Sequence, residues 1–284
     1  MVRIVSDTST MYSTAQAREA GFEVSPLSVT IAGKTYREYD EINAERFVDI
    51  INEGNMPQSS QPSVGEVAAL YEKYPDDQIL NITMARGLSG TYEGAVAAAQ
   101  TIENNDHITV INSTTLCGPH RRIVEKAAKW AAEGLSLEEI LKRVNFMIDS
   151  NKSFLMPNDF DYLRRGGRLS PMVSYVGKLA SLNPIMTQTD DMLRLTVAGV
   201  KRGFAATFKY VVSYMEKNGV DNGGEGWYIS VSHGRNLETA EKAVAIVKEA
   251  FPNAVVELFE LSPAFITQGG PKCITIQYVR DWKE

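Results

Sequence analysis

Residues 79–102 read ILNITMARGLSGTYEGAVAAAQTI, and this stretch decides the fold. Ile79–Thr83 has the composition of a buried strand, whereas Tyr92–Ile102 has the spacing of an amphipathic helix. The same order, a strand and then a helix, begins at Val2–Ser6 and again at Ile108–Asn112. This alternation predicts an α/β fold in which a parallel sheet is covered by helices in an αβα layer.

A second series of strands and helices begins after residue 150. Because the chain has 284 residues and single cores rarely grow beyond roughly 250, we predict two domains. The boundary is placed near Asn151, which gives an N-terminal domain over residues 1–150 and a C-terminal α/β domain with a mixed sheet over residues 151–284. The expected strands of the second domain are Ser153–Met156, Leu193–Val197, Trp227–Ser232, Val255–Glu260 and Ile274–Val279, and its long helices are Phe204–Lys217 and Leu237–Phe251.

The composition argues against several classes of function. A net charge of −6 gives no general attraction to nucleic acid or to anionic lipid surfaces. No uncharged stretch reaches the roughly 20 apolar residues of a spanning helix, so we expect a cytoplasmic protein without membrane insertion. The two cysteines form no C-x-x-C pair, which fits a reducing compartment, and the three histidines lie too far apart to predict a metal site.

Two connections carry hydroxyl groups suited to a small anionic head group. The first is the turn Gln58-Ser59-Ser60-Gln61-Pro62-Ser63, which leads into a helix. Ser63 opens the capping box Ser63-Val64-Gly65-Glu66, and a second box begins at Ser136. Ser59 and Ser60 are left over in this turn, either as ligand-binding hydroxyls or as parts of a well-capped helix start.

The second connection joins the strand Ile79–Thr83 to the helix that follows it. Ser89, Gly90 and Thr91 therefore lie at the carboxyl end of a strand and the amino end of a helix, where open α/β sheets bind ligands. Free backbone N–H groups and the helix dipole favour an anion there, and the glycines allow close approach of the backbone. Both a phosphate and a carboxylate fit this description.

Enzyme chemistry at these turns lacks a recognisable base. The segment Gly87–Thr91 does not have the G-x-S-x-G form of a nucleophile elbow, and neither a P-loop nor a G-x-G-x-x-G motif is present. Cys117-Gly118-Pro119-His120 has a histidine where a redox turn has its second cysteine, so a buried, inert thiol is expected. A small-molecule enzyme acting on a phosphorylated or carboxylated substrate remains the alternative to a binding protein.

Arginines cluster around two glycines in the segment Tyr162–Pro171. Arg164, Arg165 and Arg168 form a local positive island in an acidic chain, and Arg202 adds a further cation before a predicted helix. Either an acidic partner or a solvated surface with scattered ion pairs explains them. A helix is expected to begin at Ser170 and Pro171.

Several short motifs, taken in order, resemble the DegV family of bacterial fatty-acid-binding proteins, and the match runs nearly end to end. They are Asp7-Thr8-Ser9, Ser59-Ser60-Gln61-Pro62-Ser63, Gly87-Leu88-Ser89-Gly90-Thr91-Tyr92, Leu163-Arg164-Arg165-Gly166-Gly167-Arg168-Leu169-Ser170 and Leu182-Asn183-Pro184-Ile185.

The resemblance implies a two-domain carrier, not an enzyme, with no cofactor and with a long-chain fatty acid between the domains. It implies that the carboxylate is bound by Ser59, Ser89, Gly90 and Thr91, and that a separate fatty acid kinase subunit converts the carboxyl group to an acyl phosphate. We expect Ser60 and Gln268 to join this ligand-binding group, and the cations Arg165, Arg168 and Arg202 to contact the partner.

Gln268 departs from the family pattern. It occupies the position where the family usually has a histidine, two residues before a G-P-G motif. An amide can donate a hydrogen bond to a carboxylate but cannot carry a proton or a positive charge. The departure therefore bears on kinase-coupled turnover more than on binding.

Overall fold

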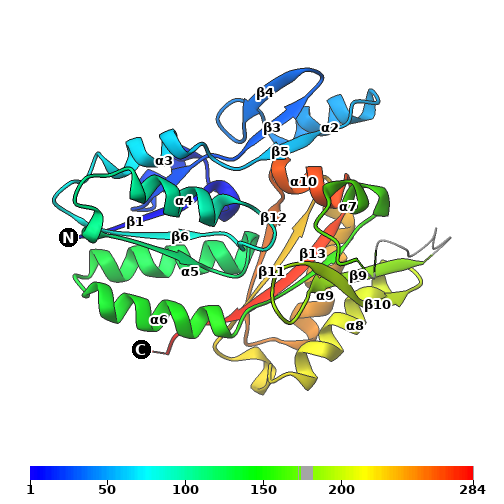
Figure 1. The fold of residues 1–284 in the computed structure, drawn as a ribbon. Coiled ribbons are helices and arrows are strands. Elements are labelled where there is room, and N and C mark those ends of the chain that lie inside the picture. Colours follow the sequence, from blue (N-terminus) through cyan, green and yellow to red (C-terminus); the bar gives the residue numbers. More distant parts are fainter. Residues whose placement is uncertain (172, 174–181, 284) are drawn as a thin grey trace.

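Two β-sheets organise the chain, one formed by its N-terminal part and one by its C-terminal part (Figure 1). The computed structural model describes residues 1–171, 173 and 182–283. The predicted α/β fold with one parallel and one mixed sheet is confirmed.

The first sheet is parallel throughout, with the strand order β2-β1-β6-β7. Side chains alternate along β1, so that Val5 packs with α3 and α4 on one face and Ile4 packs with α5 and α6 on the other. The elements of this layer are β1 (Val2–Asp7), η1 (Thr8–Thr10), α1 (Thr14–Glu19), β2 (Glu23–Ser25), α3 (Val64–Tyr71), β6 (Gln78–Thr83), α4 (Thr91–Gln100), η2 (Asn105–His107), β7 (Ile108–Asn112), α5 (Cys117–Ala132) and α6 (Leu137–Asp149).

The second sheet is mixed, with the order β10-β9-β8-β13-β11-β12, in which only β11 and β12 run parallel. Helices α8 and α9 cover its outer face (Figure 1). The elements are β8 (Lys152–Met156), α7 (Phe160–Gly166), β9 (Asn183–Gln188), β10 (Leu195–Lys201), α8 (Phe204–Lys217), η3 (Asn222–Gly224), β11 (Trp227–His233), α9 (Leu237–Ala250), β12 (Val255–Glu260), α10 (Pro263–Gly269) and β13 (Ile274–Arg280).

The predicted strands and long helices of the second half are confirmed, with one shift and one omission. Strand β10 begins at Leu195 and not at Leu193, because Leu193 belongs to a turn in which its N–H donates to Asp191 Oδ1 at 2.9 Å. Strand β9, which pairs with β10, was not predicted. The helix expected to begin at Ser170 and Pro171 lies largely outside the described residues.

The two faces of the second sheet differ in polarity. Along β13, Ile274 and Ile276 face the core beneath α8 and α9, whereas Thr275 and Gln277 point to the opposite side. The opposite side is buried as well, yet its side chains carry hydroxyl and amide groups. This polar inner face looks toward the first sheet and forms part of the site described below.

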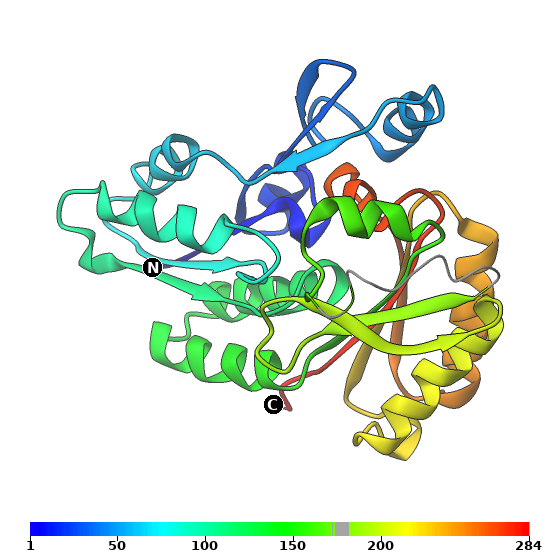
Figure 2. The ribbon, with the colours of Figure 1, turned by 45° about the vertical axis from the view of Figure 1, so that its right-hand side comes forward.

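A small antiparallel sheet with the order β4-β3-β5 was not predicted. It is formed by β3 (Ser28–Ile31), β4 (Lys34–Arg37) and β5 (Gln58–Ser60), and it packs with α2 (Ala44–Asn52) against α10 of the C-terminal part (Figure 2). The prediction that Ser59 and Ser60 lie in a turn is therefore wrong. Their backbone instead pairs with Val29 and Ser28 of β3, because the neighbouring strand supplies hydrogen-bond partners for their N–H and C=O groups.

The two halves share their core although their sheets are separate. Asn151, the proposed boundary, lies in the short connection between α6 and β8. Helix α5 is placed between the sheets, where Ile123 and Val124 belong to one cluster with Ile4 of β1 and Val279 of β13. The relative position of the sheets is thus fixed by apolar packing as well as by the chain connection.

The two predicted capping boxes differ in the structure. At α3, Ser63 Oγ accepts from Glu66 N at 3.2 Å and the Glu66 carboxylate accepts from Ser63 N at 3.3 Å, so the box is complete. At α6, only the bond from Glu139 N to Ser136 Oγ is present, at 3.3 Å. The complete box satisfies one more free N–H group than the half box.

Ser63→Ala should lower the free energy of unfolding by about 1 kcal/mol, because it removes the two hydrogen bonds of the Ser63 hydroxyl, which accepts from Glu66 N at 3.2 Å and donates to Glu66 Oε2 at 2.8 Å. Ser136→Ala should cost less, since one bond is lost there. Urea unfolding of the two variants and of the unchanged protein measures the difference. A larger loss for Ser136→Ala would contradict this account of the caps.

Candidate functional site

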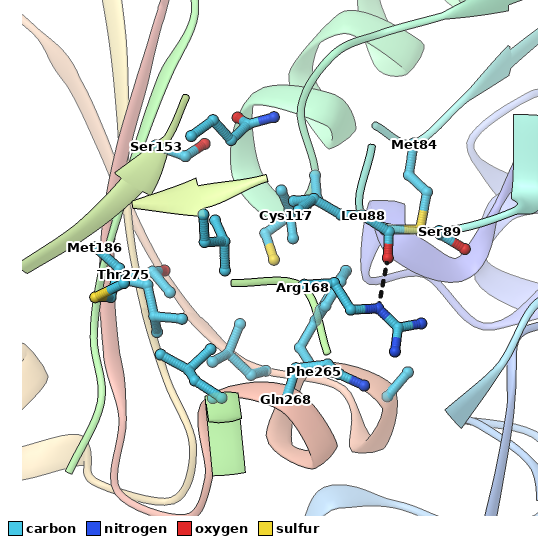
Figure 3. A pocket seen from close by; sticks show the side chains of 18 of the residues that line it. Met84, Leu88, Ser89, Cys117, Ser153, Arg168, Met186, Phe265, Gln268 and Thr275 are labelled. Atoms are coloured by element: carbon cyan, nitrogen blue, oxygen red, sulfur yellow. Dashed lines mark hydrogen bonds between the residues drawn. The ribbon is translucent and has the colours of Figure 1, made fainter. Parts of the chain in front are cut away.

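A pocket of about 960 Å³, its open mouth included, lies between the two halves of the molecule (Figure 3). Both sheets, the small sheet and the helices α7 and α10 contribute to its wall. The wall is mostly apolar, and its larger apolar side chains include Leu27, Leu116, Leu155, Leu163, Met186 and Phe265.

The first sheet supplies its part of the wall from the carboxyl ends of its strands. Met84 and Ser89 follow β6, Leu116 and Cys117 follow β7, and Leu27 follows β2. Strands β1 and β6 are neighbours in the sheet but connect onward in opposite directions, which makes their carboxyl ends a topological switch point. The pocket is located at the place where open α/β sheets bind ligands.

Buried polar side chains hold these connections in position. Asp7, at the end of β1, accepts from Ser9 N and from Met84 N, both at 2.9 Å. His120 on α5 lies 2.9 Å from the hydroxyl oxygens of both Ser6 and Ser113. Burial lowers the pKa of His120, so the ring is neutral and serves as a structural link.

The mouth of the pocket brings together the hydroxyl groups predicted from the sequence. Ser59, Ser60 and Ser89 all line it, and Gln268 of α10 joins them. Gln268 Nε2 donates to Ser59 Oγ at 3.0 Å, although the two residues are far apart in the chain. Ser89 Oγ lies 2.8 Å from Thr91 Oγ1 and accepts from Thr91 N at 3.3 Å.

Gly87 and Gly90 have packing partners other than the pocket. A Cβ atom at Gly87 would lie 2.3 Å from Leu193 Cα, so the backbones of two connections approach each other closely there. A Cβ atom at Gly90 would lie 1.9 Å from Oε1 of the Gln61 side chain. Neither Gly90 nor the buried Thr91 lines the pocket, so their part in a site is to support Ser89.

Arg168 places a partly buried cation at the mouth. Its Nε donates to Leu88 O at 3.1 Å (Figure 3), and one of its terminal nitrogens donates to Gly166 O. No carboxylate of the described residues forms an ion pair with it. Burial, and to a lesser degree the neighbouring Arg194, lower the pKa of the Arg168 guanidinium, so an anion placed here would be stabilised.

Comparison with known proteins agrees with this architecture. The model of the DegV family matches residues 1–281. The chain belongs to the DegV family. A DegV domain-containing protein of Lactococcus lactis is 31% identical over 273 residues, which is 95% of this chain and 96% of that protein. Another, from Caldanaerobacter subterraneus, is 32% identical over 78% of each chain.

Solved DegV structures have the same fold. DegV of Bacillus subtilis, described as a fatty acid binding protein, has a TM-score of 0.86 and 24% identity over 99% of both chains. A DegV family protein of Eubacterium eligens, loaded with heptadecanoic acid, has a TM-score of 0.85 and 20% identity over 99% of this chain and 100% of that one. The two-sheet arrangement is thus the DegV fold.

The three arginines predicted to meet a partner are not equally close to the mouth in this DegV chain. Arg165 is exposed on α7 and lines a second hollow that shares Ser59, Arg168 and Gln268 with the pocket. Arg202 follows the far end of β10. Leu195, at the near end of β10, donates its N–H to Arg168 O at 2.9 Å. The strand from Leu195 to its far end spans roughly 20 Å at about 3.3 Å per residue, so Arg202 lies far from Arg168.

The inner end of the pocket carries polar groups that were not predicted. Ser153 on β8 and Thr275 on β13 line it on the side away from Ser89 (Figure 3), and Gln277 on β13 joins them through a hydrogen bond to Ser153. Gln188 on β9 also lines the pocket. The sequence contains a signal for the two residues on β13. Apolar and polar residues alternate in the run I-T-I-Q that begins at Ile274, as in a strand with one face in solvent. Such alternation on a buried strand indicates a polar cavity wall.

Two buried side chains near the pocket, Cys117 and His120, have the chemistry of a nucleophile or a base. Burial raises the pKa of the Cys117 thiol well above its usual value, so the thiol is protonated at neutral pH. The buried His120 hydrogen-bonds Ser6 and Ser113 and not Ser89. Within residues 1–171, 173 and 182–283, no cluster of His, Cys, Asp and Glu can hold a metal ion, and no helix is long and apolar enough to cross a bilayer.

Gly166→Ala should weaken ligand binding at the mouth several-fold. The new Cβ atom would lie 2.1 Å from Gln268 Oε1, so the amide must swing away and lose its bond to Ser59. Gly65→Ala is a matched control, because nothing lies within 4 Å of its Cβ position. Isothermal titration with a fatty acid measures both, and equal affinities for the two variants would remove the Gln268–Ser59 contact from the site.

Proposed function

We propose that the pocket binds a long-chain fatty acid, with its carboxylate at the polar mouth and its alkyl chain along the apolar wall. The proposal rests on an apolar pocket lined by three serine hydroxyls and by Arg168, which forms no ion pair with a carboxylate of the described residues. The fatty acid bound by the Eubacterium eligens relative supports it. Each methylene group removed from water contributes about 0.8 kcal/mol, so the tail supplies most of the affinity.

The hydrogen-bond directions at the mouth favour an anion. Because Ser59 Oγ accepts from Gln268 Nε2, its own proton is free to be donated to a ligand. Thr91 Oγ1 can donate to Ser89 Oγ, which leaves the Ser89 proton free in the same way. Two hydroxyl donors beside the Arg168 guanidinium match the requirements of a carboxylate, for which charge-assisted hydrogen bonds offset the cost of desolvation. Ser60 is the outermost hydroxyl of this group, and Gly90 and Thr91 support Ser89.

We further propose that the chain presents the bound carboxyl group to a separate kinase. That enzyme would transfer the γ-phosphoryl group of ATP to a carboxylate oxygen and release ADP and an acyl phosphate. Arg165 is exposed beside the mouth and Arg168 lines it, so both suit contact with an acidic partner surface there, whereas Arg202 would require a second, more distant contact. Gln268 can bind the carboxylate in this scheme but cannot transfer a proton.

Mass spectrometry of organic extracts from the purified protein tests the binding function directly. A long-chain fatty acid is expected at close to one equivalent per chain. Repeated recovery of no lipid, together with no binding of added palmitate or stearate, would contradict the proposal. Adding a fatty acid kinase catalytic subunit and ATP to the loaded protein then tests presentation, with acyl phosphate trapped as the hydroxamate.

A further inference from the structure

Two polar side chains on β13 are buried at the inner end of the pocket with unused hydrogen-bonding atoms. Gln277 is 2% exposed and Thr275 is 8% exposed, and both line the pocket. Gln277 Oε1 and Thr275 Oγ1 have no hydrogen-bond partner among the described residues. A valine and a leucine would close an apolar tunnel without leaving such atoms unpaired, so these side chains indicate a polar occupant.

The orientation of the Gln277 amide is fixed by its other contacts. Its Nε2 donates to the carbonyl oxygen of Leu116 at 2.9 Å and to Ser153 Oγ at 2.8 Å. Because a carbonyl oxygen only accepts, the amide cannot be turned over without losing the first bond. The unpaired atom is therefore an acceptor, and it needs a donor from outside the protein.

Gln188 repeats this arrangement from the neighbouring part of the wall. Its Nε2 donates to Thr114 O at 3.0 Å, its Oε1 has no partner in the part of the chain that the structure describes, and the residue is 2% exposed. Two glutamines therefore use their amino groups to tie the second sheet to the connection before α5. Both residues line the pocket, and both leave a carbonyl oxygen without a partner among the described residues.

We propose that this inner end is a subsite for a hydroxyl group on the acyl chain, so that the preferred ligand is a hydroxy fatty acid. The proposal rests on the fatty-acid binding proposed above. The ligand hydroxyl donates to Gln277 Oε1 and accepts from the Thr275 hydroxyl, which lies on the same face of β13. A keto group in the same position has no proton to donate and leaves the amide oxygen unpaired.

Competition binding to the full chain tests the subsite with octadecanoic acids that differ at one carbon. Stearic acid is compared with a series bearing one hydroxyl group at successive positions along the chain, and the best hydroxy acid is compared with its keto counterpart. We expect one hydroxy isomer to bind about 3- to 10-fold more tightly than stearic acid, and its keto counterpart to bind more weakly than that hydroxy isomer.

Thr275→Val tests whether the preference for the hydroxy acid depends on Thr275, because it removes the hydroxyl group while the side-chain volume stays nearly the same. The ratio of the dissociation constants of stearic acid and the best hydroxy acid should fall to 1 or below in Thr275→Val and in Gln277→Met. It should be unchanged in Thr196→Val, which lies on β10 outside the pocket lining.

The outcomes separate this inference from the binding function itself. If no acid of the series binds, the proposed function fails. If stearic acid binds but every hydroxy isomer binds more weakly, the unpaired atoms hold water or serve the fold alone, and the subsite is refuted. A preference for a hydroxy acid that persists in both Thr275→Val and Gln277→Met would also overturn it.

Discussion

Fatty-acid affinity should fall about 5- to 150-fold when Ser89 is replaced by alanine, which corresponds to a loss of about 1–3 kcal/mol. Ser89 lines the mouth, and its contact with Thr91 leaves its proton available to a carboxylate. Removing it deprives a charged ligand of one donor in a partly buried position, where water replaces the donor poorly. Titration of the delipidated variant with palmitate measures the loss.

Ser136→Ala is the matched control for this experiment. It also removes a serine hydroxyl, but at the start of α6, outside the lining of the pocket. Its palmitate affinity should equal that of the unchanged protein. Because Ser89→Ala also leaves Thr91 Oγ1 with one partner fewer, urea unfolding should accompany the titration. Unchanged affinity in a folded Ser89→Ala variant would exclude Ser89 from the head-group site.

Glu38→Gln should remove a pH dependence of stability worth on the order of 3 kcal/mol between pH 5 and pH 8. Glu38 is fully buried, and burial raises its pKa to about 7 from an ordinary value of 4.5. Its carboxyl group accepts from Thr8 Oγ1 and from Ala264 N, and thereby joins the end of β1 to the start of α10.

The sign follows from which state binds the proton. Between pH 4.5 and pH 7 the folded state holds a proton on Glu38 that the unfolded state has released. Stability therefore falls as the pH rises through this window and levels off above pH 7. A glutamine cannot titrate, so the variant gains stability relative to the unchanged protein as the pH rises. Any cost of the buried amide is the same at every pH, so it does not affect the comparison between pH values.

Urea unfolding at several pH values between 5 and 8 measures this difference. Glu53→Gln, which changes an exposed carboxylate, should keep the pH dependence of the unchanged protein. If Glu38→Gln showed the same pH profile as Glu53→Gln, the buried carboxyl group would not titrate in this range.

The parallel sheet could be predicted because its signals are local. The run Ile79–Thr83, the turn at Ser89 and the following helix lie in one short stretch, and they formed as expected. The small sheet could not be predicted, because the pairing of Ser59 with Val29 spans a helix and a turn and is decided by packing on α10. Helix α10 comes more than 200 residues later in the chain.

The site was predictable to the same extent. Ser59 and Ser89 were predicted from hydroxyl-bearing connections, and Gln268 from a resemblance, and the structure brings all three to one mouth. Gln188 and Gln277 were not predicted, since their importance depends on which face of β9 and β13 is turned to the first sheet. That orientation is set by tertiary packing. The alternation of I-T-I-Q shows which residues of β13 share a face, but not which face is turned to the first sheet.

The pocket wall is shared between two sheets that also share a core around α5. A ligand in this pocket would fill the space between the two sheets, so the loss of the ligand would expose apolar side chains of both sheets to water. A fatty acid bound as proposed would therefore leave more slowly the longer its alkyl chain, because each methylene group returned to water costs about 0.8 kcal/mol. Under the proposed function, a partner that covers the mouth would receive the ligand without exposing its alkyl chain to water.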